Sequence, residues 1–265
     1  MRIPLILQRR PPKTTSDPDI AGGGMGFGSA TPTGAVGSVG PARPPAWERT
    51  SGVRVDKPTR LLYQAISLLL DYPTQQLIDS LPLMRVTVAQ CLARGVRSAA
   101  RLVPLLDHVE ATPLQDLERD YVETFDLRRR CCLHLSYYGY GDTRKRGMAL
   151  LDIKQTYLAS GVDLAECELP DHLCVLLEFT ATVDPPVGRV LLSDNRPGIE
   201  LLRISLADRD SVYVAALEAL TGTFPTLLGN EKDVVRALIA AGPPDEEVGM
   251  EAYQSGSHSS GMVRR

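Results

Sequence analysis

Apolar residues recur at helical spacing through almost the whole of the chain after residue 57. After Pro58, apolar side chains return every three or four positions until Tyr72-Pro73 interrupts the pattern. Pro58 itself suits the first turn of a helix, where its missing N–H has no intrahelical partner to lose. No run alternates apolar and polar residues between hairpin turns, as a half-buried strand would. The spacing therefore predicts an all-α fold.

The clearest predicted helix start lies at residue 112. Thr112 is placed to cap, Pro113 to open the first turn and Gln115 to reach back as a capping box. Tyr121 and Phe125 then share one apolar stripe, and the rest of the segment to residue 126 is strongly acidic. The segment predicts an amphipathic helix with both aromatic rings facing the core.

A second predicted helix runs from Asp142, as N-cap, to Ala159, with Gly161 just beyond it as a left-handed cap. Six further segments show the same periodicity: 81–94, 98–110, 170–183, 196–208, 211–222 and 230–241. Together they predict a single globular bundle of roughly eight to ten helices.

The two ends of the chain differ from this middle part. Residues 1–56 are rich in glycine and proline, and residues 242–265 have a similar composition. Neither segment carries enough clustered apolar surface to offset the entropy lost on ordering. We therefore expect disordered tails at 1–56 and 242–265, flanking one helical domain at 57–241.

Composition and targeting signals point to the cytoplasm. Arg9-Arg10 is not followed by the apolar stretch that a twin-arginine export signal requires, and no apolar run approaches the roughly 20 residues that span a bilayer. The five cysteines are an odd number in a chain without an export signal, which argues against a disulfide framework.

Two basic clusters, Arg128–Arg130 and Arg144–Arg146, interrupt an otherwise slightly acidic chain of net charge −3. The second cluster falls in the first turn of a predicted helix, where each cation is disfavoured by about 0.3–1 kcal/mol. Either the acidic 112–126 helix or the acidic surface of a partner protein would compensate it. A scaffold that binds nucleic acid through these arginines is disfavoured by the overall charge.

Acidic residues also recur in the second half of the chain. If several of them line one groove, that groove would favour a basic peptide and accelerate its capture. The candidates are Asp163, Glu166, Glu168, Asp171, Glu178 and Asp184.

A metal site is one interpretation of the segment Cys131-Cys132-Leu133-His134. Adjacent cysteines do not easily both point at one tetrahedral metal ion, and buried cysteine is common in cytoplasmic proteins. We therefore expect no bound metal. The side chains that would have to complete such a site are Cys167, His172 and Cys174.

A thiol- or metal-dependent enzyme that uses Cys131, Cys132 and His134 is the main alternative function. A catalytic cysteine needs a base within hydrogen-bonding reach and a third group that orients the base. No glycine-rich nucleophile turn, phosphate-binding loop or dinucleotide fingerprint accompanies these residues. The sequence therefore favours a protein that is not an enzyme and has no cofactor of its own.

Several of these motifs together resemble the NarJ family, the delta-subunit-like assembly chaperones of respiratory nitrate reductase, within the TorD/DmsD group of redox-enzyme maturation proteins. The resemblance covers about residues 58–225, and the block from Cys131 to Arg144 is its most specific part. The matching segments are 68–73 (LLLDYP), 120–126 (DYVETFD), 131–138 (CCLHLSYY), 141–147 (GDTRKRG), 169–173 (LPDHL) and 176–179 (LLEF).

This resemblance implies an all-helical cytoplasmic chaperone that binds the immature catalytic (alpha) subunit of nitrate reductase, especially its N-terminal segment. The chaperone would hold that subunit ready for insertion of molybdenum cofactor and an iron–sulfur cluster, both of which belong to the client, before the enzyme docks on the membrane. No nucleic-acid partner and no membrane insertion are implied. The positions that match the family's middle block are candidate client contacts: Tyr121, Phe125, His134, Tyr137, Tyr138, Asp142, Arg144 and Arg146.

Tyrosines offer rigid, amphipathic contact area, which suits a groove that binds a peptide. We therefore expect Tyr137→Ala or Tyr138→Ala to weaken client binding with little change in melting temperature. Tyr121 and Phe125 lie on an apolar stripe and are expected to be core residues instead.

Overall fold

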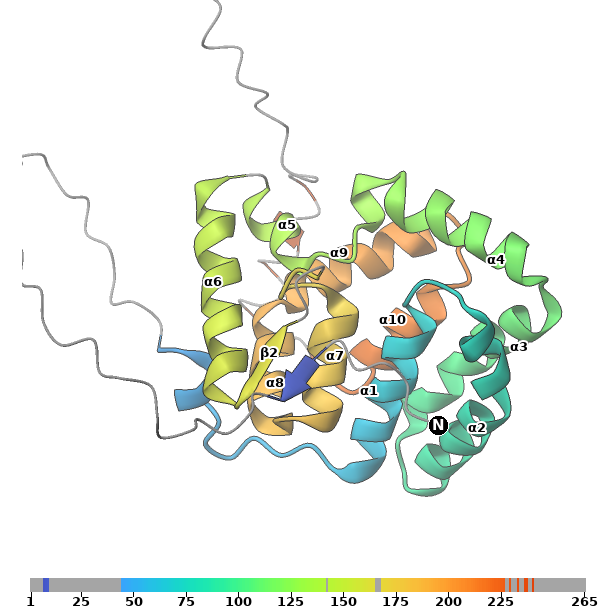
Figure 1. Cartoon of the computed structure of the whole chain (residues 1–265), viewed down its shortest axis with the longest axis horizontal. Helices are drawn as coiled ribbons and strands as arrows, with labels where there is room; N and C mark the ends of the chain where they lie inside the picture. The colour runs from blue at the N-terminus through green and yellow to red at the C-terminus, as the bar shows by residue number, and fades with distance from the viewer. Residues whose placement is uncertain are drawn as a thin grey trace, which may run out of the picture.

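The computed structural model describes residues 44–141, 143–164 and 168–226, together with the backbone of residues 7–9 and the isolated positions 229, 233, 236, 237 and 240. This part of the chain forms a bundle of α-helices joined by short turns (Figure 1). The helices are α1 (Lys57–Leu69), α2 (Gln75–Ala93), α3 (Val103–Ala111), α4 (Leu114–Tyr121), α5 (Leu135–Tyr140), α6 (Arg144–Ala159), α7 (Leu173–Thr182), α8 (Pro185–Asp194), α9 (Arg196–Ala207) and α10 (Val214–Thr221). The predicted all-α class and helix number are confirmed.

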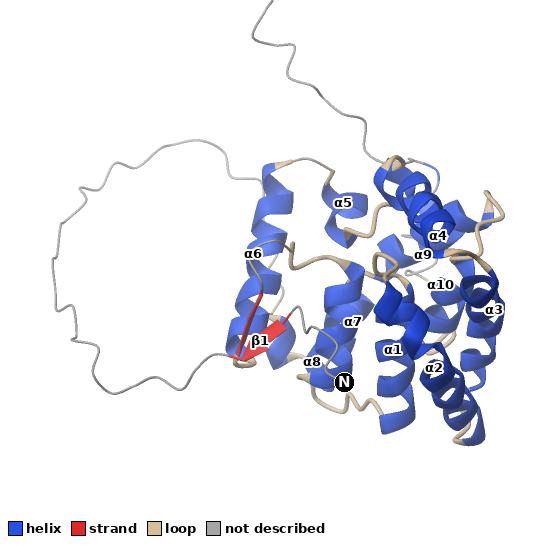
Figure 2. Ribbon diagram, turned by 45° about the vertical axis from the view of Figure 1, so that its right-hand side comes forward, coloured by secondary structure: helices blue, strands red, loops and turns tan. Residues whose placement is uncertain are grey.

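Helix α7 lies at the centre of the bundle, beside α1 (Figures 1 and 2). Every residue from Leu173 to Ala181 is buried, which explains why α7 is mostly apolar on all sides, with Glu178 and Thr180 as buried polar exceptions. Two side chains of α1 bond to the α7 backbone: Ser67 Oγ donates to Cys174 O at 2.9 Å, and Arg60 Nε donates to Ala181 O at 2.8 Å. These bonds fix the register of the two central helices.

Helix α8 was not predicted, because Pro185-Pro186 reads as a break in the sequence. Both prolines instead occupy the first turn, where no N–H is required, and the Asp184 carboxylate accepts a bond from Val187 N at 3.2 Å. Gly188 then allows α8 to approach α7 closely, since a Cβ there would collide with the backbone and side chain of Thr180. The short helix α5 was missed as well.

The predicted start at residue 112 was wrong in detail. Pro113 itself precedes the first helical residue, Leu114, and no side chain caps this end. Helix α4 then passes into a π-helical turn at η3 (Val122–Asp126). Predicted segment 98–110 is also divided, into the 3-10 helix η2 (Arg97–Leu102) and α3.

Helix α6 follows the predicted boundaries closely. Its N-cap is Thr143, while the predicted cap, Asp142, lies outside the described residues. Gly161 has the predicted left-handed conformation, with φ of +81°. The next residues form β2 (Val162–Leu164), which pairs antiparallel with β1 (Leu7–Arg9), a small addition that the sequence analysis did not predict.

Part of the segment assigned to the N-terminal tail packs on the bundle. The 3-10 helix η1 (Ala46–Glu48) buries Ala46, and the Arg49 guanidinium forms a two-pronged ion pair with Asp194 of α8, with N–O distances of 2.9 and 2.5 Å. Both tails otherwise lie mostly outside the described residues, so their predicted disorder stays a prediction. No described helix is long and apolar enough to span a bilayer.

Candidate functional site

Segments that the sequence analysis singled out at distant positions meet where α1 and α4 end. Tyr121 Oη donates to Leu70 O at 3.3 Å, and the Tyr72 ring meets the Tyr121 ring edge-on at 5.4 Å. Phe125 also packs against Tyr121, with ring centroids 4.9 Å apart. Tyr121 and Phe125 are both buried, as predicted for core positions.

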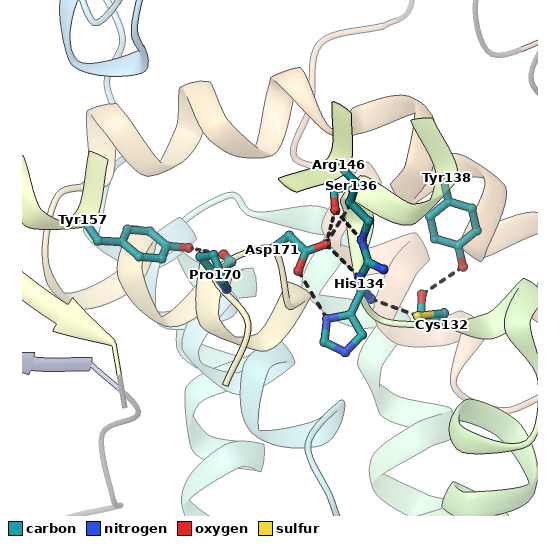
Figure 3. Close-up of polar contacts among 8 residues, drawn as sticks. All are labelled: Cys132, His134, Ser136, Tyr138, Arg146, Tyr157, Pro170 and Asp171. Carbon is teal, nitrogen blue, oxygen red and sulfur yellow. Dashed lines mark hydrogen bonds and ion pairs between the residues drawn. The ribbon is translucent and has the colours of Figure 1, made fainter. Parts of the chain in front are cut away.

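A buried carboxylate organises the adjoining loops. The Asp171 side chain is fully buried and accepts bonds from Ser136 N at 3.1 Å and from Ser136 Oγ at 2.5 Å. His134 Nδ1 lies 3.3 Å from Asp171 Oδ1 (Figure 3). Burial alone would raise the pKa of Asp171, but the bonds from His134 and Ser136 outweigh it, so the pKa lies below its ordinary value. Asp171 is therefore ionised at neutral pH.

Arg146 from the first turns of α6 supplies the positive charge next to this carboxylate. Its Nε donates to Ser136 Oγ at 3.2 Å, and its Nη2 lies 4.0 Å from Asp171 Oδ2. The cation expected to pair with the acidic 112–126 helix is thus balanced here by Asp171. Ser136 and Asp171 were not among the predicted client contacts, although both lie in segments that carry the family resemblance.

The backbone joins the same two loops. Leu135 N donates to Asp171 O at 3.1 Å and Leu173 N to Leu133 O at 2.9 Å, so that His134 and His172 face each other in a β-bridge. Their rings lie edge-to-face, 5.0 Å apart. Burial first, and the neighbouring His134 second, lower the pKa of His172 to about 4. His172 is therefore neutral at physiological pH.

Tyr137 and Tyr138, which the sequence analysis gave as candidate client contacts, are not exposed in the fold. Both rings are buried, and Tyr138 Oη bonds to Cys132 O at 2.9 Å and Arg130 O at 3.0 Å. Helix α9 passes directly behind α5, where a Cβ on Gly198 would come within 3.2 Å of the Tyr138 ring.

The remaining predicted contacts keep some access to solvent. His134 is partly exposed, Arg146 less so, and Arg144 is exposed. Asp142 lies outside the described residues. Of the eight predicted residues, four are therefore buried and three reach the surface of the described structure.

The described surroundings of Cys131 and His134 do not favour a catalytic thiol–base pair. Cys131 is buried, and burial raises the pKa of its thiol, which disfavours the nucleophilic thiolate. Cys132 Sγ is bonded to the backbone N–H of His134 at 3.4 Å, and the His134 imidazole is bonded to Asp171. Within the described residues no group of three or more histidine, cysteine or acidic side chains could hold a metal ion. Cys167 lies outside that part of the chain.

An acidic surface lies next to the Asp171 network and consists of Asp71, Tyr72, His134, Glu168 and Leu169. Tyr72 and Leu169 are large apolar residues left 44% and 42% exposed. Burial and the nearby Asp71 carboxylate raise the pKa of Glu168, and His134 opposes this shift. The surface therefore combines two neighbouring carboxylates with exposed apolar area, which suits a segment carrying both cationic and apolar side chains.

A cleft of about 1120 Å³ opens on the other side of Ser136, between η1, α5, α6, α8 and α9. Leu135, Ile153 and Leu191 supply apolar wall, and the partly exposed rings of Trp47 and Tyr140 stand at its sides. This volume is at the upper end of the range for small-molecule pockets and also suits a short peptide segment.

The family model described as "Nitrate reductase delta subunit" matches residues 89–218, which include α3 to α9 and the whole Asp171 network. The nitrate reductase molybdenum cofactor assembly chaperone NarJ of Escherichia coli K12 is 31% identical over 168 residues, which cover 63% of this chain and 71% of that protein. The chain belongs to the NarJ family. The resemblance inferred from the motifs is thereby confirmed.

Two other relatives show how widely this helical unit is used. The probable assembly chaperone NarJ of Bacillus subtilis is 29% identical over 161 residues, covering 61% of this chain and 86% of that protein. The nitrate reductase-like protein NarX of Mycobacterium tuberculosis H37Rv is 38% identical over 165 residues, covering 62% of this chain but only 24% of NarX. The NarJ-like unit thus occurs both as most of a protein and as a quarter of a much longer one.

Proposed function

We propose that this NarJ-family protein is a system-specific chaperone. It binds the immature catalytic subunit of a respiratory nitrate reductase in the cytoplasm and assists insertion of molybdenum cofactor before the enzyme docks on the membrane. Membership of a family whose members are named nitrate reductase molybdenum cofactor assembly chaperones carries this proposal. The cofactor belongs to the client, and the chaperone acts by binding without making or breaking a bond.

The acidic surface is the proposed contact for the N-terminal segment of the client. Tyr72 and Leu169 provide apolar area, while Asp71 and Glu168 provide negative charge beside it. A client segment that is disordered before binding loses conformational entropy when it becomes ordered. Chaperone side chains that are already rigid lose little entropy of their own, which increases the affinity. Tyr72 is held in place by the buried Tyr121 ring.

The predicted client contacts then divide into two roles. His134 lies at the acidic surface and contacts the client directly, while Arg144 and Arg146 extend the contact region along α6. Tyr121 and Phe125 hold the acidic surface from behind. Tyr137 and Tyr138 position the loop that carries His134, because Tyr138 bonds to the backbone of that loop.

Calorimetric titration with a synthetic peptide tests this function. The peptide is the N-terminal segment of the nitrate reductase catalytic subunit from the same genome. We expect saturable binding that Glu168→Gln and Tyr72→Ala each weaken about tenfold, since the loss of one contact commonly costs about 1–2 kcal/mol. Leu83→Ala is the matched control for Tyr72→Ala, because Leu83 of α2 is exposed and lies in a different region.

Three results would count against the proposal. Absence of any heat of binding with folded protein at moderate salt would contradict client recognition. Binding that is unchanged by Glu168→Gln and Tyr72→Ala would instead move the contact away from the acidic surface. Binding to all peptides of similar charge would show electrostatic attraction without the specificity that a dedicated chaperone needs.

A further inference from the structure

Helix α2 is apolar on its outer face as well as on its inner face. It lies at the edge of the bundle, on the side away from α6, and packs on α1, η2 and α3 (Figures 1 and 2). Its inner face buries Leu77, Leu81, Met84, Val88 and Cys91. The exposed side chains from position 82 to position 93 are nevertheless all uncharged. They are Pro82, Leu83, Val86, Ala89, Gln90, Leu92 and Ala93.

Two of these outer side chains are large and open to solvent. Leu83 is 67% exposed and Val86 is 52% exposed. A helix whose inner face already fills the core normally carries charged residues toward water, as α6 does with the exposed Asp152 and Lys154. Adjoining exposed apolar side chains are typical of a surface that contacts another protein.

The outer side chains form a continuous line along α2, which we call the outer seam. Its members follow one another at intervals of four, three and four positions, the spacing that keeps residues on one side of a helix. They are Pro82, Val86, Ala89 and Ala93.

Arg85 is the single charged residue from position 82 to position 93, and it is directed toward α3. Its Nη2 lies 2.7 Å from Asp107 Oδ1 and 2.5 Å from Glu110 Oε2, both on that helix. Successive residues of an α-helix are about 100° apart, so Arg85 lies beside the outer seam rather than on it. The seam is therefore free of charge along its length.

The two ends of the outer seam carry opposite charges. Asp79 is exposed and lies two turns before Val86, and Arg94 is exposed and lies eight positions after Val86. Antiparallel packing of two α2 helices about Val86 would place Asp79 of each copy opposite Arg94 of the other. Parallel packing would place like charges together. Because a two-fold axis requires a surface that is complementary to itself, this pattern favours a second copy over an unrelated partner.

We infer that two copies of this chain associate through the outer seam, with their α2 helices antiparallel and Val86 near the two-fold axis. Val86 and Leu83 supply apolar contact, and the small side chains of Ala89 and Ala93 let the helices approach closely. One helix from each copy buries little area, so the dimer is weak, with a Kd on the order of 10 μM. The inference does not rest on the proposed chaperone function.

Sedimentation velocity of the full chain tests this association. Between about 1 and 200 μM the wild type should pass from monomer to dimer. Val86→Lys places a charge at the centre of the seam and should raise the Kd at least about tenfold. Leu151→Lys is the matched control, because Leu151 is a 46% exposed apolar residue of α6, on the other side of the bundle. It should leave the Kd unchanged, and circular dichroism should show both variants folded.

Charge reversal tests the antiparallel orientation. Asp79→Lys places a lysine opposite Arg94, and Arg94→Glu places a glutamate opposite Asp79. Each unfavourable pair occurs twice in a symmetric dimer, so each single variant should weaken association about tenfold. The double variant restores both pairs with their signs exchanged and should dimerise like the wild type. In a parallel dimer the double variant would still bring like charges together.

Four results would overturn the inference. The first is a wild type that stays monomeric over the whole concentration range. The second is equal Kd values for Val86→Lys and Leu151→Lys, and the third is a double charge variant that associates no better than the single variants. The fourth is a monomeric wild type whose catalytic subunit is lost on Val86→Lys, which would assign the outer seam to the client instead of a second copy.

Discussion

His134 and Asp171 are 37 positions apart in the sequence, yet His134 Nδ1 lies 3.3 Å from Asp171 Oδ1. The carboxylate also binds the N–H and hydroxyl groups of Ser136, and Arg146 lies within 4.0 Å. A buried, ionised aspartate therefore joins three segments around the loop that carries His134. Removal of the Asp171 carboxylate should therefore destabilise that loop more than the loss of a surface charge would.

Asp171→Asn should lower the free energy of unfolding by about 2–4 kcal/mol, since the neutral amide cannot accept all of the bonds to a carboxylate and leaves Arg146 less compensated. Chemical denaturation monitored by circular dichroism measures the change. Asp208→Asn, at an exposed position after α9, is the matched control and should change stability by less than about 0.5 kcal/mol. A loss of under about 1 kcal/mol for Asp171→Asn would contradict its organising role.

His172 should make the protein less stable in mild acid. Its pKa is lowered to about 4 in the fold from an ordinary value of 6.5, so the unfolded chain takes up a proton before the folded chain does. Stability is then fully present above about pH 6.5 and is lost progressively as pH falls towards 4, by up to about 3 kcal/mol. Denaturation midpoints measured between about pH 7 and pH 4 test this.

His172→Phe keeps an aromatic ring against His134 but removes the titrating group. The variant should therefore lose less stability than the wild type over the same pH interval. Asp171 acts at lower pH, because its pKa is lowered and its stabilising contribution is lost only as pH falls below its ordinary value of 3.8. Parallel pH curves for the wild type and His172→Phe would show that another group is responsible.

Tyr138→Ala should destabilise the protein by about 3–5 kcal/mol, because the ring is buried between α5 and α9. Tyr138→Phe removes only the hydroxyl bonds to the loop backbone and should cost about 1–2 kcal/mol. Tyr140→Ala, two residues later and 44% exposed, is the control with little expected effect. Equal, small effects of all three changes would instead support a surface role for Tyr138.

Helical periodicity was sufficient to predict the fold class and most helices, because burial of one face is a local, repeating signal. Helix α8 was missed because the same Pro-Pro pair is compatible with a break or with a first turn, and the choice depends on packing against α7. The Asp171 network was also not predictable in detail. Its donors come from α5, α6 and the preceding loop, and no local pattern specifies which distant groups will meet.

The two adjacent tyrosines show the same limit at the candidate site. A Tyr-Tyr pair is compatible with a contact surface, but both rings are buried, and α9 approaches the Tyr138 ring closely at Gly198. Such an approach depends on the tertiary path of the chain. Conversely, Tyr72 and Leu169 belong to one surface with His134 and Glu168 because α1 packs beside α7. No local sequence pattern specifies that packing.

Gly188→Ala tests the close contact between α7 and α8. A Cβ at this position would meet Thr180, whose backbone cannot yield easily, so the change should destabilise by about 1–3 kcal/mol. Gly147→Ala in α6 is the matched control, since no neighbouring atom lies within 4 Å of the position that its new methyl group would take. Alanine there should instead stabilise the helix by about 0.5–1 kcal/mol. If both substitutions changed the free energy of unfolding in the same direction, the inferred packing of α7 against α8 would be contradicted.

Co-purification tests the proposed chaperone function most directly. The protein, carrying an affinity tag, is expressed with the nitrate reductase catalytic subunit of the same genome, and the eluate is analysed by mass spectrometry and for molybdenum. We expect the immature catalytic subunit to elute with the wild type and to be reduced with Glu168→Gln combined with Tyr72→Ala. Recovery of the protein alone, with the catalytic subunit folded and active in its absence, would contradict the function proposed for it.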